Sequence, residues 1–128
     1  MIGSMPLVFL VDDEPRIARA LEFALRGTDI ELMALADPGQ LEPRLEESQP
    51  DAILLDIGLA RQDGLAVCRR LNEHARFGAI PVLLLSGQTG ADMKAAGFAA
   101  GADDFIGKPF VPTELSPGSG RRSRVASP

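Results

Sequence analysis

Tryptophan and tyrosine are absent from the 128-residue sequence, and cysteine and histidine occur only once each. The single cysteine, Cys68, excludes an internal disulfide, and one cysteine with one histidine cannot supply the ligands of a structural zinc site. No apolar run approaches the roughly 20 residues that span a bilayer. We therefore expect no membrane-spanning segment, no secretory leader and a reducing, cytoplasmic setting.

Basic residues are also scarce over most of the chain, although the overall net charge is only −5. The last 13 residues contain three arginines and no acid, so residues 1–115 hold ten basic and 18 acidic residues. A protein that binds nucleic acid directly needs a basic face to neutralise phosphates. The acidic body therefore argues against a direct nucleic-acid partner.

The sequence does contain short apolar runs, each of which stops on a polar residue. They are Leu7–Val11 before Asp12 and Asp13, Ala52–Leu55 before Asp56, Pro81–Leu85 before Ser86, and Phe105–Gly107 before Lys108. Continuously apolar runs of this length are typical of strands buried on both faces of a parallel sheet. Because the carboxyl ends of parallel strands share one edge, we expect these polar side chains to meet in one crevice.

Helix-like segments alternate with the runs and predict a repeated strand–helix unit of about 22 residues. We expect helices over Pro15–Arg26, Gly64–Asn72 and Ala91–Ala100, and a weaker edge strand over Glu31–Leu35. The helix after that strand contains Pro43, and an interior proline costs about 3 kcal/mol. We therefore expect a short, kinked or late-starting helix there. His74 is expected on the exposed surface and Cys68 in the core.

A fifth helix is barely begun. Pro112–Leu115 is a plausible first turn, but prolines and glycines follow at once, so Ser116–Pro128 is expected to be a flexible tail after a domain over residues 5–115. Three explanations compete: the chain is cut from a larger protein, it has an altered C-terminus in place of the helix, or this face is covered by a partner copy or a swapped element. Self-association through the face left by the short fifth helix is the expected consequence.

The three carboxylates can be interpreted in two ways. Asp12 and Asp13 taken alone would be helix caps, and Asp56 alone would simply turn the chain. Together in one crevice they are costly unless a cation lies among them, and a few hard oxygen ligands favour Mg²⁺. Lys108 would be their countercharge. A serine nucleophile at Ser86 has no support, because His74 follows the third helix, away from the crevice.

In order and spacing, five motifs resemble the receiver domain of two-component response regulators. They are Asp12-Asp13, Leu54-Leu55-Asp56, Leu84-Leu85-Ser86-Gly87, Gly101-Ala102-Asp103-Asp104-Phe105 and Lys108-Pro109-Phe110. The resemblance covers Leu7 to Leu115. It implies a flavodoxin-like, doubly wound (βα)5 parallel sheet with strand order 2-1-3-4-5, in which the fifth helix of this chain is truncated or missing.

The resemblance also implies a role for each site residue. Asp56 would accept a phosphoryl group from a phosphohistidine on a sensor histidine kinase or a histidine phosphotransfer protein. Asp12, Asp13, Asp56 and the backbone carbonyl of Gly58 would hold Mg²⁺. Lys108 and Ser86 would bind phosphoryl oxygens, and Phe105 would move with Ser86 as a switch. The chain would then be a phospho-acceptor that assists its own phosphorylation and dephosphorylation rather than an enzyme for other substrates.

Some positions depart from the family pattern. Leu59 and Ala60 replace the Met-Pro that often follows the acceptor, which would loosen the loop that carries the Gly58 carbonyl. Gly58 and Gln88 occupy positions that influence the phosphoryl lifetime in the family. Three alternatives compete with the switch: an aspartyl-phosphate phosphatase, a flavin-binding flavodoxin-like protein, and a receiver-like protein-interaction scaffold that is not phosphorylated. The missing Trp and Tyr count against flavin, and the complete acid, serine and lysine set counts against the scaffold.

Overall fold

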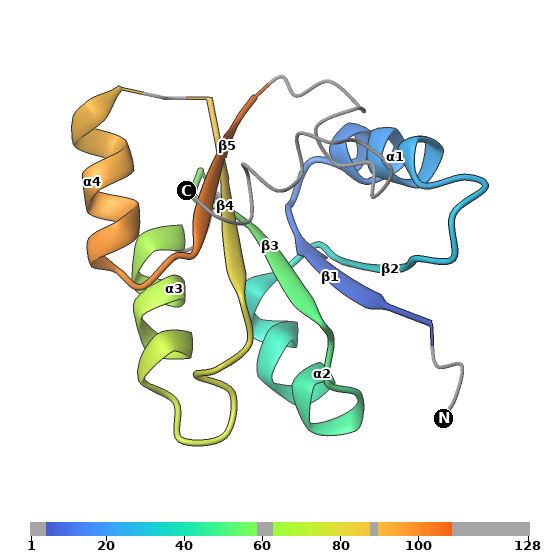
Figure 1. Cartoon of the computed structure of the whole chain (residues 1–128), viewed down its shortest axis with the longest axis horizontal. Coiled ribbons are helices and arrows are strands. Elements are labelled where there is room, and N and C mark those ends of the chain that lie inside the picture. The colour runs from blue at the N-terminus through green and yellow to red at the C-terminus, as the bar shows by residue number, and fades with distance from the viewer. Residues whose placement is uncertain (1–4, 59–62, 88–89, 109–128) are drawn as a thin grey trace.

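A five-stranded parallel sheet forms the centre of the computed structural model, which describes residues 5–58, 63–87 and 90–108 (Figure 1). The strands are β1 Leu7–Val11, β2 Glu31–Leu35, β3 Ala52–Asp56, β4 Val82–Ser86 and β5 Asp104–Gly107. Their order is β2-β1-β3-β4-β5, and every pair is parallel. The predicted doubly wound sheet and its strand order are therefore confirmed.

Helices cover both faces of the sheet. They are α1 Pro15–Ala24, a 3-10 turn η1 Pro38–Gln40, α2 Leu41–Glu47, α3 Gly64–Glu73 and α4 Ala91–Ala99. Among the described residues, α1 packs alone on one face over a small core, to which it contributes Leu21. The other three helices pack on the opposite face over the larger core (Figure 1). No helix in the described part of the chain is long and apolar enough to cross a membrane.

The late-starting second helix is confirmed. Asp37 caps the 3-10 turn by accepting a hydrogen bond from the N–H of Gly39 at 2.9 Å, and α2 begins only at Leu41. Pro43 therefore lies in the first turn of α2, where a backbone N–H has no partner within the helix. The helix keeps its proline at little cost because it starts two residues before it.

Two glycines allow close packing that a side chain would prevent. A Cβ on Gly64, the first residue of α3, would lie 2.3 Å from Cα of Ile57 and 2.6 Å from the carbonyl oxygen of Asp56. A Cβ on Gly97 would lie 2.8 Å from Cδ1 of Leu84 and 3.2 Å from Cδ2 of Phe105. Gly97 therefore weakens α4 in propensity but lets the helix approach the sheet.

The prediction for His74 was wrong in part. It follows α3 as expected, yet its side chain is only 28% exposed. Its ring stacks on Phe77 with centroids 4.4 Å apart, and Nδ1 accepts hydrogen bonds from the backbone N–H groups of Arg76 and Phe77. The histidine is thus a structural acceptor in the loop before β4. Cys68 is fully buried, as predicted.

Several expectations lie outside the described residues. They concern Leu59 and Ala60, Gln88, Pro109 and Phe110, the short fifth helix, and the Ser116–Pro128 tail.

Candidate functional site

The polar residues that end the strands do meet at the carboxyl edge of the sheet. β3 ends at Asp56, which pairs with Leu85 in the ladder, and the neighbouring β4 ends at Ser86, which pairs with Gly107. Asp12 follows the last residue of β1, and Lys108 follows the last residue of β5. The parallel register alone therefore brings these four positions, which span almost a hundred residues of sequence, to one edge.

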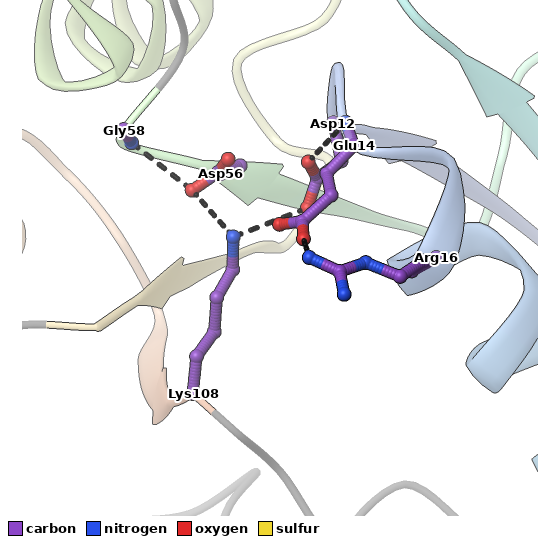
Figure 2. Close-up of polar contacts among 6 residues, drawn as sticks. All are labelled: Asp12, Glu14, Arg16, Asp56, Gly58 and Lys108. Carbon is purple, nitrogen blue, oxygen red and sulfur yellow. Dashed lines mark hydrogen bonds and ion pairs between the residues drawn. The ribbon is translucent and has the colours of Figure 1, made fainter.

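A cation and two buried carboxylates form the centre of the site. Nζ of Lys108 lies 3.1 Å from Oδ1 of Asp56 and 3.3 Å from Oδ2 of Asp12 (Figure 2). The same Oδ1 of Asp56 accepts a hydrogen bond from the N–H of Gly58 at 3.0 Å. Asp56 is 4% exposed and Asp12 is 5% exposed. Buried carboxylates are costly unless they are paired, and the Lys108 ammonium forms an ion pair with both of them.

The pKa values of Asp12 and Lys108 are both raised, for different reasons. Burial raises the pKa of Asp12 to about 6, helped by the nearby Asp56 carboxylate and opposed by the N–H of Glu14 and by Lys108. Burial alone would lower the pKa of Lys108, but its ion pairs with Asp56 and Asp12 outweigh this and raise it. The lysine therefore stays charged near neutral pH, whereas Asp12 binds a proton more readily than an exposed aspartate does.

Three carboxylates are arranged as a cation site would require. One oxygen from each of Asp12, Asp13 and Asp56 lies within 4.8 Å of the others. Oδ2 of Asp12 is buried, and in the described part of the chain its polar contact is the ion pair with Nζ of Lys108 at 3.3 Å. A metal ion beside the lysine would complete the pairing of this oxygen. An all-oxygen donor set of few residues that is open to water suits Mg²⁺. The predicted ligand residues therefore fit this ion.

A cavity of ≈ 530 Å³ opens beside these carboxylates. Its lining comprises Asp13, Glu14, Asp56, Ile57, Gly58, Asp63, Leu65, Ser86, Gly87, Met93 and Lys108. Every predicted site residue except Asp12 and Phe105 lines this space, and Asp12 lies behind it in contact with Lys108. The cavity therefore has a carboxylate, a hydroxyl and an ammonium on its walls.

The main chain ties two of these groups together. The N–H of Lys108 donates to the carbonyl oxygen of Ser86 at 2.7 Å, immediately beyond the last pair of the β4–β5 ladder. Phe105 lies apart from the cavity, half-buried, with its ring beside Gly97 of α4. The structure thus places Phe105 at the contact between β5 and α4 rather than among the site residues.

Two acidic residues of the cavity lining, Glu14 and Asp63, were not predicted from the sequence. Glu14 lines the cavity and pairs with Arg16, with Oε2 of Glu14 2.8 Å from NH2 of Arg16 (Figure 2). The signal was present, because Glu14 directly continues the Asp12-Asp13 pair in the sequence. Glu14 is the N-cap residue of α1, and an acidic residue at the start of a helix is an ordinary helix feature, so the sequence alone does not mark it as a site residue.

The fold and this site define a flavodoxin-like, doubly wound α/β protein with an acidic, cation-suited cavity at the carboxyl edge of its sheet. Residues 8–117 match the response regulator receiver domain. The chain therefore belongs to the receiver domain family of two-component signalling.

Relatives and solved structures agree with this family. Transcriptional regulatory protein PrrA of Mycobacterium leprae is 38% identical over 112 residues, which are 88% of this chain and 47% of the relative. DNA-binding response regulator MtrA of Mycolicibacterium smegmatis is 34% identical over 84% of this chain and 46% of its own length. The chain thus spans about half the length of these curated relatives.

Solved structures show the same fold over nearly the whole chain. The crystal structure of a candidate response regulator from Chloroflexus aurantiacus J-10-fl superposes with a TM-score of 0.84 at 32% identity, covering 98% of this chain and all of that one. Chemotaxis response regulator CheY4 of Vibrio cholerae superposes with a TM-score of 0.80 at 25% identity, covering 88% of this chain and 93% of its own.

Proposed function

We propose that this chain is a Mg²⁺-dependent signalling switch that accepts a phosphoryl group on Asp56 from a phosphohistidine of a sensor kinase or a phosphotransfer protein. The observation that carries the proposal is the position of Asp56. It is buried at the floor of the cavity, and Oδ1 is held by both Lys108 and Gly58. A carboxylate fixed in this way is oriented for in-line attack on phosphorus.

The chain's own residues divide the work of transfer. Asp12, Asp13 and Asp56, with the carbonyl of Gly58, would hold the ion, which supplies positive charge to the phosphoryl oxygens. Lys108 supplies a second positive charge beside Asp56, and its raised pKa keeps that charge at neutral pH. Gly58 N–H and Lys108 hold one carboxylate oxygen in place. The buried floor limits the water that reaches the acceptor.

The conformational response would begin at Ser86. A phosphoryl group adds about −1.5 to −2 charge and three acceptor oxygens, and the Ser86 hydroxyl on the cavity wall is in a position to donate to one of them. Phe105 lies one strand away, at the Gly97 contact of α4. We propose that movement of the Ser86 segment changes how Phe105 packs under α4. The altered α4 and β5 surface would be read by a partner protein or by a second copy of the chain.

The proposal extends to location and partners. We propose a cytoplasmic location, because the phosphohistidine donor would be inside the cell. A single, buried, unpaired cysteine is compatible with that reducing setting. The chain itself is proposed not to contact nucleic acid, although relatives that are about twice as long are named as DNA-binding regulators. In a longer protein of that kind, DNA binding would belong to the part that lies outside the region matched by this chain.

Intact mass after incubation with acetyl phosphate and Mg²⁺ tests the proposal. The expected result is one adduct of a single phosphoryl group, which is lost in Asp56→Asn and when the metal is chelated. Asp51→Asn is the matched control, because Asp51 immediately precedes the other end of β3 and accepts a hydrogen bond from the N–H of Leu7. An unmodified parent protein, or an adduct that persists in Asp56→Asn, would overturn the proposal.

A further inference from the structure

Glu14 occupies the rim of the acidic cavity, between the buried carboxylates and solvent. Its N–H donates to Oδ1 of Asp12 at 2.9 Å, so its backbone is fixed to the site. Its side chain lines the cavity and is 40% exposed. Glu14 is therefore a negative charge that a molecule entering from solvent meets before it reaches Asp56.

Arg16 accompanies this carboxylate. It lies on the first turn of α1, and its guanidinium NH2 approaches Oε2 of Glu14 to 2.8 Å while its side chain remains 83% exposed (Figure 2). An exposed pair of this kind contributes little to stability. Its effect is on the local field, because the two residues together place one negative and one positive charge at the entrance.

The charged residues in the rest of the described cavity wall are mostly acidic, so a charge at the entrance affects how easily an anionic donor approaches. Asp13, Asp56 and Asp63 line the space, whereas Lys108 is the single basic residue of that lining. A phosphoryl donor is itself an anion. Even with a divalent cation bound, the donor enters a space in which each added or removed unit of charge alters its free energy of approach. That effect grows in proportion to the donor's own charge.

We propose that the Glu14–Arg16 pair is a specificity-determining element that sets how strongly the site discriminates between phosphoryl donors of different negative charge. The inference rests on the proposed phosphorylation of Asp56. In the parent protein, Arg16 offsets Glu14. Loss of the Glu14 charge favours the more anionic donor, and loss of the Arg16 charge disfavours it.

Two small donors that differ by one charge supply the test. Acetyl phosphate is a dianion near neutral pH, and phosphoramidate is a monoanion with a protonated nitrogen. In each case an Asp56 oxygen forms a bond to phosphorus while the bond to the leaving atom breaks. Acetyl phosphate releases acetate, and phosphoramidate releases ammonia, whose nitrogen keeps the bonding electron pair and its three hydrogens. The rate of adduct formation is measured by intact mass at saturating Mg²⁺.

The selectivity ratio, defined as the acetyl phosphate rate divided by the phosphoramidate rate, is the readout. Glu14→Gln should raise the rate about fourfold with the dianion and about twofold with the monoanion at 0.1 M ionic strength, so the ratio rises about twofold. Arg16→Gln should lower the ratio by a similar factor. The double variant restores the net charge of the entrance, and its ratio should return to that of the parent. A merely structural disturbance would slow both donors alike and leave the ratio unchanged.

Matched controls lie near the far end of α1, Glu22 within the helix and Arg26 two residues beyond its last residue. Glu22→Gln makes the same charge change about 12 Å along the axis from Glu14, beyond the Debye length of about 10 Å. Arg26→Gln is the corresponding control for Arg16. Both residues are exposed, and both variants should keep the parent ratio. At an ionic strength of about 1 M, screening should bring the selectivity ratios of all the variants close to that of the parent.

The outcomes separate the two proposals. If neither donor modifies the parent, the phosphorylation proposal fails and this inference falls with it. If the parent is modified but Glu14→Gln and Arg16→Gln keep its ratio, or the ratio shifts equally in Glu22→Gln, phosphorylation stands and the Glu14–Arg16 proposal is wrong.

Discussion

Asp103 and Val82 are joined by two hydrogen bonds at the amino edge of the sheet. The N–H of Val82 donates to Oδ2 of Asp103 at 2.8 Å, and the N–H of Asp103 donates to the carbonyl oxygen of Val82 at 2.8 Å. Asp51 and Leu7 repeat the arrangement between β3 and β1, with both distances 2.7 Å. A carboxylate thus extends the ladder where the backbone alone would leave an N–H unpaired.

Asp103→Ala should therefore destabilise the protein. It leaves the N–H of Val82 without its partner at a half-buried position, a loss worth about 1–2 kcal/mol. Urea unfolding measures the change. Asp103→Asn keeps an acceptor oxygen and should recover most of the loss, whereas Asp29→Ala, at an exposed loop position, should be neutral. Equal losses in Asp103→Ala and Asp29→Ala would contradict the role of this carboxylate.

Asp12 should make the metal-free protein less stable as the pH rises through the weakly acidic range. Its pKa in the folded state, about 6, lies above its ordinary value of 3.8. Between these values the folded protein holds a proton that the unfolded chain has released, so the free energy of unfolding falls as the pH increases. Denaturation in chelator from pH 4 to 7 measures this slope. Asp12→Asn should flatten it, and an unchanged slope in that variant would refute the assignment.

Lys108→Met should make the stability of the folded protein depend more strongly on Mg²⁺. Without the ammonium, Asp12 and Asp56 lose the cation they share, and the metal-free variant should lose stability by about 3–5 kcal/mol near neutral pH. Mg²⁺ should then raise Tm more in the variant than in the parent, because the ion supplies the missing charge. Lys94→Met, on the exposed surface of α4, is the control. A smaller Mg²⁺ response in Lys108→Met than in the parent would exclude this account.

Gly64→Ala should disturb the end of β3. The added Cβ would overlap Ile57 and the carbonyl of Asp56, both of which are backbone atoms, so the segment that leads to Gly58 must shift. We expect a loss of at least about 2 kcal/mol together with weaker Mg²⁺ binding. Gly90→Ala is the matched control, since Gly90 precedes α4 at the same edge and its Cβ would meet nothing within 4 Å. Comparable losses in both variants would rule out the proposed overlap.

The strand ends were predictable because they depend on a local pattern. An apolar run followed by Asp56 or Ser86 identifies both the strand and the end at which its polar residue lies. Because the strands are parallel, these ends meet at one edge of the sheet. The late start of α2 was equally local, since Pro43 tolerates only a first-turn position.

What escaped prediction depends on contacts between distant segments. From the sequence, Gly97 is only a residue that weakens a helix. The close approach of Leu84 and Phe105 in the structure explains why a glycine occupies this position. His74 reads as a surface residue until Phe77 folds back onto its ring. The ion pair of Glu14 depends on a rotamer of Arg16, which no spacing rule specifies.

The hydrogen bond from the N–H of Lys108 to the carbonyl of Ser86 has a mechanical consequence. Ser86, which carries the hydroxyl, and Lys108, which carries the charge, are joined directly by this backbone hydrogen bond, so a displacement of either backbone strains the other. In the proposed switch, detection of the phosphoryl group and compensation of its charge would be a single concerted movement. The relaxation of the two segments after the phosphoryl group leaves would then follow one time constant rather than two.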